Sequence, residues 1–381
     1  MGYPPLSEVR KSLRVSWYRC PIEPRDLRQL LQRSDLEGFK QAGGHLALWI
    51  VTGSLAYIAW INSAWLWLLL ALFIHGVVSS FFSGTAPHEL GHGTVFKTPW
   101  LNSFFLYLFS FISWWDPFDY ASSHTYHHRF TLHPKADREN LLPLSPIVSP
   151  FTVLQLLTIN VFGEKGRTFG KGGLLSTIYV TVLSAMRKTG PARIPSNEWL
   201  NAIHQDQPVQ FEKSVVWSRL LLVFHGAVFF GSLLSGQWIF VFIISTSSFT
   251  AKIFSHLAGM TQHCGLKEND TDFRKSTRSI VLNPVLEFLY WRMNWHTEHH
   301  MFAGVPCYNL KKLHNLVRDD MPRPRTLREA WLEMTQTWRI QQHDSAYFHD
   351  TEVPISTANY HSDSTDFHSI GDLAPQGLKE I

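Results

Sequence analysis

The sequence predicts an all-α integral membrane protein with about four transmembrane helices in two hairpins and a cytosolic helical cap. Three observations carry this prediction: two long stretches without charged residues, a basic N-terminal segment, and four short clusters of histidine. Of the 381 residues, 45% are hydrophobic and 17% are charged, and the formal net charge is +4. We interpret this charge as a consequence of membrane topology, and nothing in it indicates a nucleic-acid partner.

The two apolar stretches predict the transmembrane helices. Neither Gln41–His88 nor Leu220–Ala251 contains an Asp, Glu, Lys or Arg residue. A bilayer core needs roughly 20 apolar residues per helical crossing, so each stretch is long enough for about two helices. Charge-free runs of this length, with tryptophans at their edges, argue against the alternative of buried helices in a large soluble protein. Small uncharged turns divide the stretches into four expected spans: near 45–61, 64–83, 216–234 and 237–257.

Charge asymmetry orients the chain. Residues 1–40 contain eight Lys or Arg residues, whereas the turns within the two pairs of spans contain none. By the positive-inside rule, the N-terminal segment, the central region and the C-terminal region are therefore cytosolic. The membrane is the endoplasmic reticulum in a eukaryote or the cytoplasmic membrane in a bacterium. The three cysteines provide no disulfide framework, which fits a reducing cytosol.

We expect the chain to have three parts. A cytosolic N-terminal segment (1–40) precedes a membrane domain (41–320), and a cytosolic C-terminal extension (321–381) follows it. The extension ends in a polar tail, from about His343, that we expect to be poorly ordered.

The histidine clusters predict a metal centre. On a helix, residues three or four positions apart share a face, so the spacings HxxxH and HxxHH direct their imidazoles to one place. A lone histidine is usually a surface or core residue, but three dense clusters at helical spacing are not expected by chance. Neutral imidazole is the commonest metal ligand near pH 7, and this number of imidazoles suits two metals held close together. The clusters read HELGH, HTYHH, QHCG and HTEHH and supply nine candidate ligands: His88, His92, His124, His127, His128, His263, His296, His299 and His300.

The predicted topology places every cluster on the cytosolic side of the membrane. The apolar run Leu101–Trp115 lies between the first two clusters and has only fifteen residues. If it crossed the membrane, those clusters would face opposite compartments and would not share metals. We therefore interpret it as an interfacial or re-entrant element, and we extend this interpretation to the shorter apolar stretches 151–162 and 174–186.

The ligand set favours redox iron but leaves zinc open. Zinc is satisfied by four ligands, or by three and a water, and structural zinc more often recruits cysteine. A hydrolytic di-zinc enzyme would usually add carboxylate ligands. Ferrous iron with nitrogen ligands binds oxygen and generates an oxidant that removes hydrogen from an unactivated C–H bond. A hydrophobic shell would tune that oxidant and exclude water.

The boxes HELGH, HTYHH and HTEHH resemble the three histidine boxes of the membrane-bound fatty acid desaturase and hydroxylase superfamily. Their order, spacing and placement relative to the hairpins match from about Gln41 to Leu316. The C-terminal block around GMTQHCGLKENDTDFR and NWHTEHHMFA is similar to a desaturase-like subgroup that includes the rhizobitoxine-pathway desaturase. This chain departs from that subgroup at Trp295 and Ala303. The resemblance implies a centre of two irons that uses O2 and two external electrons, and it implies that His263 is an additional ligand.

Electrons must come from another protein, because the sequence contains no cofactor motif that would supply them. It has no glycine-rich dinucleotide fingerprint, no haem attachment site, no fused b-type cytochrome motif and no four-cysteine iron–sulfur pattern. A ferredoxin or a membrane b-type cytochrome, with its reductase, is therefore the expected donor.

The leading interpretation is an O2-dependent desaturase that introduces a C=C double bond into an acyl or alkyl chain, either a fatty acyl lipid or a specialised metabolite. The alternatives are hydroxylation of the same C–H bonds, a non-catalytic metal carrier, and a di-zinc hydrolase. Within the spans, either a place on a substrate path or a hydrogen-bonded packing role suits His75 and His225. Polar residues near the boxes are candidates for orienting the ligands: Glu89, Asp116, Asp119, Asp137, Asn294 and Glu298.

Overall fold

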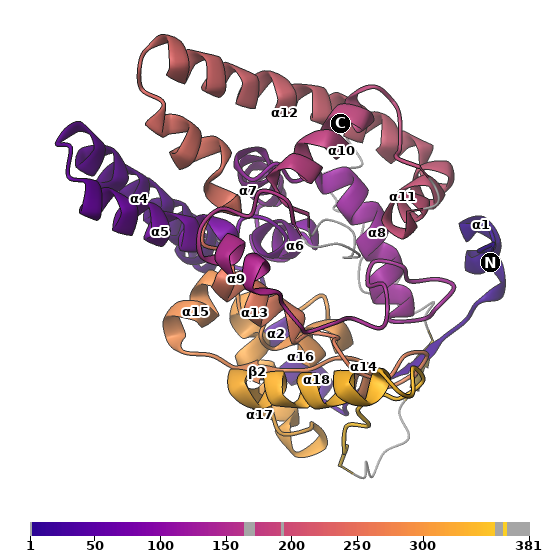
Figure 1. Ribbon diagram of the computed structural model, residues 1–381. Coiled ribbons are helices and arrows are strands. Elements are labelled where there is room, and N and C mark those ends of the chain that lie inside the picture. Colours follow the sequence, from indigo (N-terminus) through magenta and orange to yellow (C-terminus); the bar gives the residue numbers. More distant parts are fainter. Residues whose placement is uncertain (1, 164–171, 192–193, 355–360, 364–381) are drawn as a thin grey trace.

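The part of the chain that the structure describes is mostly helical, as the sequence predicts (Figure 1). All three cysteines are buried and free. The computed structural model describes four ranges of residues: 2–163, 172–191, 194–354 and 361–363.

The first charge-free stretch forms a hairpin of two long helices. α4 (Gly44–Ile61) follows the π-helical turn η1 (Phe39–Gly43), and α5 (Trp65–Ser80) packs back against it. Short helices extend the hairpin at its base, where α3 (Asp35–Gly38) leads into η1 and α6 (Thr85–Gly91) follows α5. The two resulting helical runs are 27 residues long each, which is sufficient to cross a membrane. The first predicted pair of spans is thus present.

The second charge-free stretch forms one long helix and one broken element. α12 (Pro208–Leu234) has 27 residues and is apolar enough to cross a membrane. Residues 237–257 do not form the continuous helix that we expected. They contain the π-helical turn η2 (Val241–Ser245) and the 3₁₀ turn η3 (Ser247–Phe249), and they lead into α13 (Ile253–Met260). In the described ranges, three helical runs rather than four are long and apolar enough to span a bilayer.

Side chains from neighbouring helices satisfy the backbone of the broken element. His75 donates from Nε2 to the carbonyl of Ile243 at 2.9 Å, and Trp114 donates from its indole to the carbonyl of Ser245 at 2.9 Å. The Ser245 hydroxyl is also 2.9 Å from Nδ1 of His225. Backbone groups inside a bilayer must find partners within the protein, so these bonds replace those that a regular helix would make. His75 and His225 therefore have the hydrogen-bonded packing role.

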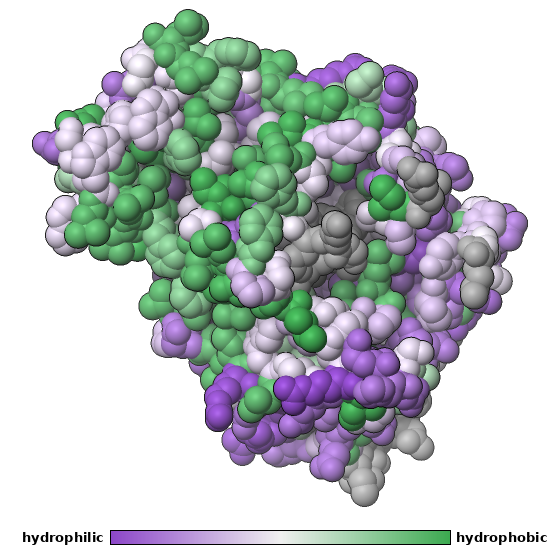
Figure 2. All heavy atoms as spheres, viewed as in Figure 1, coloured by the Kyte–Doolittle hydropathy of each residue, from purple (hydrophilic) through white to green (hydrophobic). Residues whose placement is uncertain are grey.

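Large apolar side chains face outward along the helical hairpins. Leu66, Val223 and Leu234 are 77%, 70% and 89% exposed. Soluble monomers rarely expose contiguous apolar surface on this scale. Figure 2 shows apolar surface over the region where Figure 1 places α4, α5 and α12, whereas strongly polar side chains gather over α18 (Leu327–Gln341). These exposed apolar faces, on helices long enough to cross a bilayer, indicate a membrane protein.

Shorter helices fill the central part of the chain. The apolar helices α7 (Pro99–Ile112) and α10 (Leu174–Ala185) have 14 and 12 residues, too few to cross a bilayer core alone, and their interfacial or re-entrant placement stays a prediction. α8 begins with Pro117, and the Asp116 carboxylate caps it by accepting the N–H groups of Phe118 and Asp119. The central helices are α7 (Pro99–Ile112), α8 (Pro117–Phe130), α9 (Pro150–Leu157), α10 (Leu174–Ala185) and α11 (Pro195–Asp206).

The largest hydrophobic core joins both ends of the chain to the centre. Trp17 from the N-terminal segment, Phe109 from α7 and Trp291 from the C-terminal half are buried in it. The N-terminal segment is thus packed into the domain that carries the histidines. The remaining elements of the two ends are α1 (Leu6–Ser12), β1 (Ser16–Tyr18), α2 (Pro24–Leu30), α14 (Phe273–Ser276), β2 (Ile280–Val281), α15 (Pro284–Leu289), α16 (His296–Met301), η4 (Cys307–Asn309), α17 (Leu310–Val317), η5 (Arg318–Asp320), β3 (Arg325–Thr326) and β4 (His361–Asp363).

The strands are short and tie distant segments together. β1 pairs with β4 in antiparallel register, and β2 pairs with β3 in parallel register. The C-terminal extension is also held against the histidine-bearing region, since the N–H of His349 donates to the carbonyl of Gly265 at 2.8 Å and Thr351 is buried. Residues 343–354, which belong to the tail that we expected to be poorly ordered, therefore make defined contacts. The tail at 355–360 and 364–381 lies outside the described residues.

Candidate metal centre

The structure gathers all nine candidate ligands into two groups, in which every histidine but the half-buried His92 is buried. The ligand atoms of each group lie within 4.8 Å of one another, and both groups consist of histidine alone. We call them the five-histidine group (His88, His92, His124, His128 and His299) and the four-histidine group (His127, His263, His296 and His300). Their assignment as ligands remains a prediction.

Three short helices and one turn supply these side chains. HELGH lies on α6 and its C-terminal cap, HTYHH lies on α8, and HTEHH opens α16. His263 lies in the turn after α13. We expected each box to direct its imidazoles to one place, but α8 and α16 each contribute to both groups, because adjacent residues of a helix point in different directions. The groups are adjacent, since the ring centroids of His128 and His300 are 4.4 Å apart.

The imidazoles of each group approach one another through their Nε2 atoms. In the five-histidine group, Nε2 of His128 and Nε2 of His299 are 3.2 Å apart. In the four-histidine group, Nε2 of His296 is 2.9 Å from His263 and 3.1 Å from His300. The Nε2 atoms therefore point to common centres, which is the convergence that a metal ion requires.

Several of the opposite ring nitrogens meet acceptors outside the groups. His127 Nδ1 donates to Asp137 at 2.8 Å, and His263 Nδ1 donates to the carbonyl of Ser276 at 2.9 Å. His88 Nδ1 lies 3.1 Å from Glu89, which is also 3.5 Å from Nδ1 of His299. An imidazole that donates from Nδ1 carries its lone pair on Nε2, the form that binds a metal.

This tautomer pattern fits two metal ions. Metal-bound histidines usually donate their second N–H to a carboxylate or a backbone carbonyl, as several do here. The buried Nε2 atom of His124 has no hydrogen-bond partner among the described residues, and such an atom is costly unless a ligand engages it. All-imidazole groups without cysteine suit iron, copper or zinc.

Burial keeps these imidazoles neutral. Removal from water, together with the neighbouring imidazoles, lowers the pKa of four of them well below the ordinary value of histidine: His124, His128, His299 and His300. For the carboxylate of Asp137, burial acts to raise the pKa, but the His127 imidazole and two backbone N–H donors outweigh it and lower that pKa. An ionised Asp137 hydrogen-bonded to His127 is an arrangement that stabilises a bound cation.

Only some of the predicted orienting residues contact the ligands. Glu89 and Asp137 do so, as described above. The Asp119 carboxylate accepts from His204 at 2.9 Å, and the Asn294 amide donates to the carbonyl of Ile280 at 2.9 Å. Glu298 binds His314 and Ser279, and Asp116 caps α8. Trp295, one of the two departures from the resembling subgroup, donates to Glu287 and stacks on His314.

One orienting carboxylate lies outside the predicted candidates. Glu139 lies 3.2 Å from Nδ1 of His124 and accepts from the Ser123 hydroxyl at 2.7 Å. The Ser123 hydroxyl in turn accepts the indole N–H of Trp199 at 2.9 Å. Glu139 follows Asp137 by two residues in an irregular segment, and that proximity is the signal that could have identified it.

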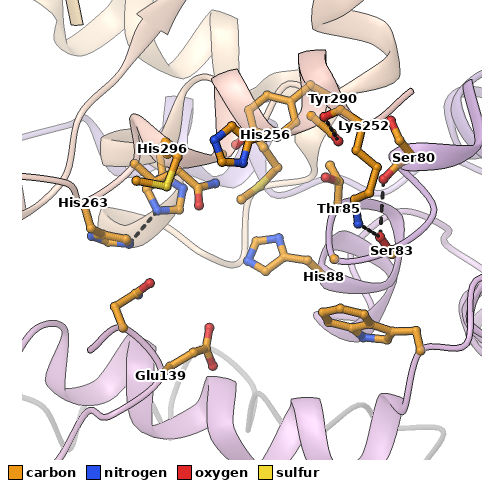
Figure 3. Close-up of a pocket in the computed structure, with 18 of the residues that line it drawn as sticks. Ser80, Ser83, Thr85, His88, Glu139, Lys252, His256, His263, Tyr290 and His296 are labelled. Atoms are coloured by element: carbon orange, nitrogen blue, oxygen red, sulfur yellow. Dashed lines mark hydrogen bonds between the residues drawn. The ribbon is translucent and has the colours of Figure 1, made fainter. Parts of the chain in front are cut away.

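A cavity of about 170 Å³ opens onto both groups. Figure 3 shows the His88 imidazole pointing into it, with His263 and His296 on one side and Glu139 below. His124 and His127 also line it, so both histidine groups border the same space. His256, which lies outside the motifs, lines the cavity as well. A molecule in this cavity would therefore lie beside both histidine groups.

Comparison with known proteins identifies the family to which this chain belongs. The family model for fatty acid desaturases matches residues 63–331, which is more than two thirds of the chain and includes all nine histidines. A search of curated proteins found no match. The narrower resemblance to the rhizobitoxine-pathway subgroup stays a prediction. On the family match, supported by the buried histidine groups and the apolar helices, this chain belongs to the fatty acid desaturase family of membrane oxidoreductases.

Proposed function

We propose that the protein is an O2-dependent di-iron oxidoreductase that introduces a C=C double bond into an acyl or alkyl chain. The observation that supports this most directly is the pair of adjacent all-histidine groups bordering one cavity. Two irons would be held by the five-histidine and four-histidine groups. When bound, they would supply the activation of O2 that removes hydrogen from an unactivated C–H bond.

The residues of the chain prepare the site for this reaction. Asp137, Glu89 and Glu139 fix the orientation of their histidine partners, so that each Nε2 lone pair faces its centre. Complete burial of His299 and His300 keeps bulk water from the centre, which protects a reactive oxidant from side reactions. The shared cavity holds the carbon to be oxidised near both groups.

The balanced reaction requires an electron donor. Conversion of CH2–CH2 to CH=CH releases two hydrogen atoms, and with O2, two further electrons and two protons it yields two molecules of water. We propose that a ferredoxin or a membrane b-type cytochrome, fed by its reductase, delivers these electrons at the cytosolic face. The basic N-terminal segment supports a cytosolic active site by the positive-inside rule, in the endoplasmic reticulum or the bacterial cytoplasmic membrane.

The test compares products in cells. Cells that express the wild-type chain, the His299→Ala variant or the His343→Ala variant are analysed by untargeted mass spectrometry of lipids and small metabolites. His343 is exposed and lies outside both histidine groups, so its variant is the matched control. We expect a product lacking two hydrogens in the wild type and the control, and its absence from His299→Ala and from oxygen-starved cells. A product with one added oxygen would establish hydroxylation instead, and identical profiles in all cells would refute oxidative catalysis.

A further inference from the structure

The cavity that borders both histidine groups has many polar side chains in its wall, beside apolar ones such as Leu156, Met260 and Met293. A site for the apolar part of a fatty acyl chain needs apolar side chains, but much of the wall that is not histidine carries hydroxyl and amide groups. These polar residues come from the end of α5, the turn after it, α6, the segment before α9, and α13 with the turn that follows it: Ser80, Ser83, Thr85, Asn140, Ser255 and Gln262. The wall is therefore suited to a substrate with a polar group near the metals.

A lysine contributes a positive charge to this wall. Lys252 directly precedes α13, and its ammonium donates to the Ser83 hydroxyl at 3.2 Å and lies 5.6 Å from the ring centroid of Phe249. The sequence alone suggests that Lys252 extends to the membrane interface. Instead, its side chain crosses to the end of α5 and lies beside Thr85 and His88 in Figure 3. It also borders a second cavity of about 360 Å³, which shares Ser83, Lys252 and two aromatic residues with the first.

A buried tyrosine supplies an independent sign of a ligand. Tyr290 is 3% exposed and lines the same cavity, and its hydroxyl has no hydrogen-bond partner among the described residues. Burial raises the pKa of Tyr290, so this hydroxyl keeps its proton and remains a donor. A buried donor without an acceptor costs free energy, and an oxygen atom of a ligand would remove that cost. Figure 3 shows Tyr290 on the same side of the cavity as Lys252 and Ser80.

We propose that Lys252 and Tyr290 bind an anionic group of the substrate, a carboxylate or a phosphate, inside the cavity that borders the metals. The proposal rests on the proposed function and narrows its substrate class. Since the first cavity is small and contains both Lys252 and His88, the oxidised carbon lies only a few bonds from the anionic group. The second cavity then accommodates the remainder of the molecule.

Charge-assisted hydrogen bonds explain why an anion would be selected. An ammonium group donating to a carboxylate or phosphate oxygen forms a bond about twice as strong as one between neutral groups, and an apolar surround strengthens it further. A neutral head group would engage Tyr290 but would gain little from Lys252. A preference for anionic over neutral ligands is therefore the property that distinguishes the proposed site from a general apolar tunnel.

The test measures binding and does not depend on turnover. Iron-loaded protein in lipid nanodiscs is titrated with octanoate, octyl phosphate and octanol, and the iron content of every sample is measured. Lys252→Gln removes the charge, Lys252→Arg keeps it, and Tyr290→Phe removes the unpartnered hydroxyl. Lys40→Gln is the matched control, because Lys40 lies near the base of the first span and pairs with Glu37 outside both cavities.

We expect Lys252→Gln to weaken the binding of octanoate or octyl phosphate by at least about tenfold and to leave octanol binding nearly unchanged. Lys252→Arg and Lys40→Gln should bind both anions nearly as the wild type does, and Tyr290→Phe should show a smaller loss. Preference for one of the two anions identifies the carboxylate or the phosphate as the natural group. Equal binding of the anions by wild type and Lys252→Gln, at equal iron content, would overturn the proposal. Since no turnover is needed, this result would leave the proposed oxidation untouched.

Discussion

Replacing Asp137 with asparagine should weaken metal binding at the four-histidine group without changing the fold. One oxygen of Asp137 accepts N–H groups from His127 and from the backbone of Leu132, both at 2.8 Å. The other oxygen accepts the backbone N–H of Glu139 at 3.0 Å. An asparagine of the same size turns one of these acceptors into a donor. At least one N–H then faces another donor, or His127 shifts its proton to Nε2 and no longer presents a lone pair to the metal.

Two independent estimates of the magnitude agree. Loss of a partner that orients a metal-bound histidine typically costs about 10- to 100-fold in metal affinity. Hydrogen bonds to a charged group contribute about 1.5–3 kcal/mol, which corresponds to roughly the same range of affinity. We therefore expect the metal of the four-histidine group to bind about 10- to 100-fold more weakly, while the five-histidine group, which does not contact Asp137, keeps its metal.

The assay is chelator competition, followed by metal analysis of the purified protein. As chelator increases, the Asp137→Asn variant should lose one metal per chain well before the wild type does. Asp35→Asn is the control, because Asp35 also accepts a backbone N–H, from Thr98 at 2.8 Å, but lies away from both histidine groups. Equal retention of both metals by Asp137→Asn and the wild type would refute the role of Asp137, as would an equal loss in the control variant.

Two further predictions concern the framework around the centre. Gly76→Ala should lower the free energy of unfolding by about 1–3 kcal/mol, because its Cβ would lie 2.7 Å from the carbonyl oxygen of Thr250. Thermal unfolding in detergent tests this, and Gly226→Ala, where the new Cβ meets nothing within 4 Å, should be nearly neutral. Glu333→Ala should cost about 3–5 kcal/mol, because it leaves the buried guanidinium of Arg278 without its carboxylate partner. Glu333→Gln keeps a hydrogen-bonding side chain and should cost less in the same measurement, whereas equal losses would show that the charge does not matter.

The candidate ligands of the three boxes could be predicted because histidines three or four residues apart come close together on a helix. On α8, His127 turns toward the other group, which the expectation of one place for each box did not include, whereas His124 and His128, four residues apart, share one face as expected. The period of the helix fixes this relation before any tertiary contact forms. The first hairpin was predictable for a similar reason, since a charge-free run of that length has few other stable conformations than a pair of spanning helices.

The broken element at 237–257, the role of Glu139 and the position of Lys252 could not be predicted, because each depends on contacts between residues distant in the sequence. Hydropathy predicts a regular helix over 237–257, but it does not show that His75 and Trp114 can satisfy the carbonyls released by a break. Glu139 reaches His124 from an irregular segment without periodicity. Lys252 lies at the cavity because its ammonium reaches Ser83, just after α5. The sequence around Lys252 does not reveal this contact, because Ser83 is distant along the chain.

The contact between His349 and Gly265 has a consequence for how the protein is made. Domains begin to fold from the N-terminus during synthesis, at roughly 5–20 residues per second. The membrane hairpins can therefore insert while the last histidine box is still untranslated. Residue 349, which holds the segment that follows His263, leaves the ribosome later still. A chain interrupted before His296 therefore lacks the third histidine box, and a chain interrupted before His349 lacks the backbone hydrogen bond that ties the C-terminal extension to Gly265.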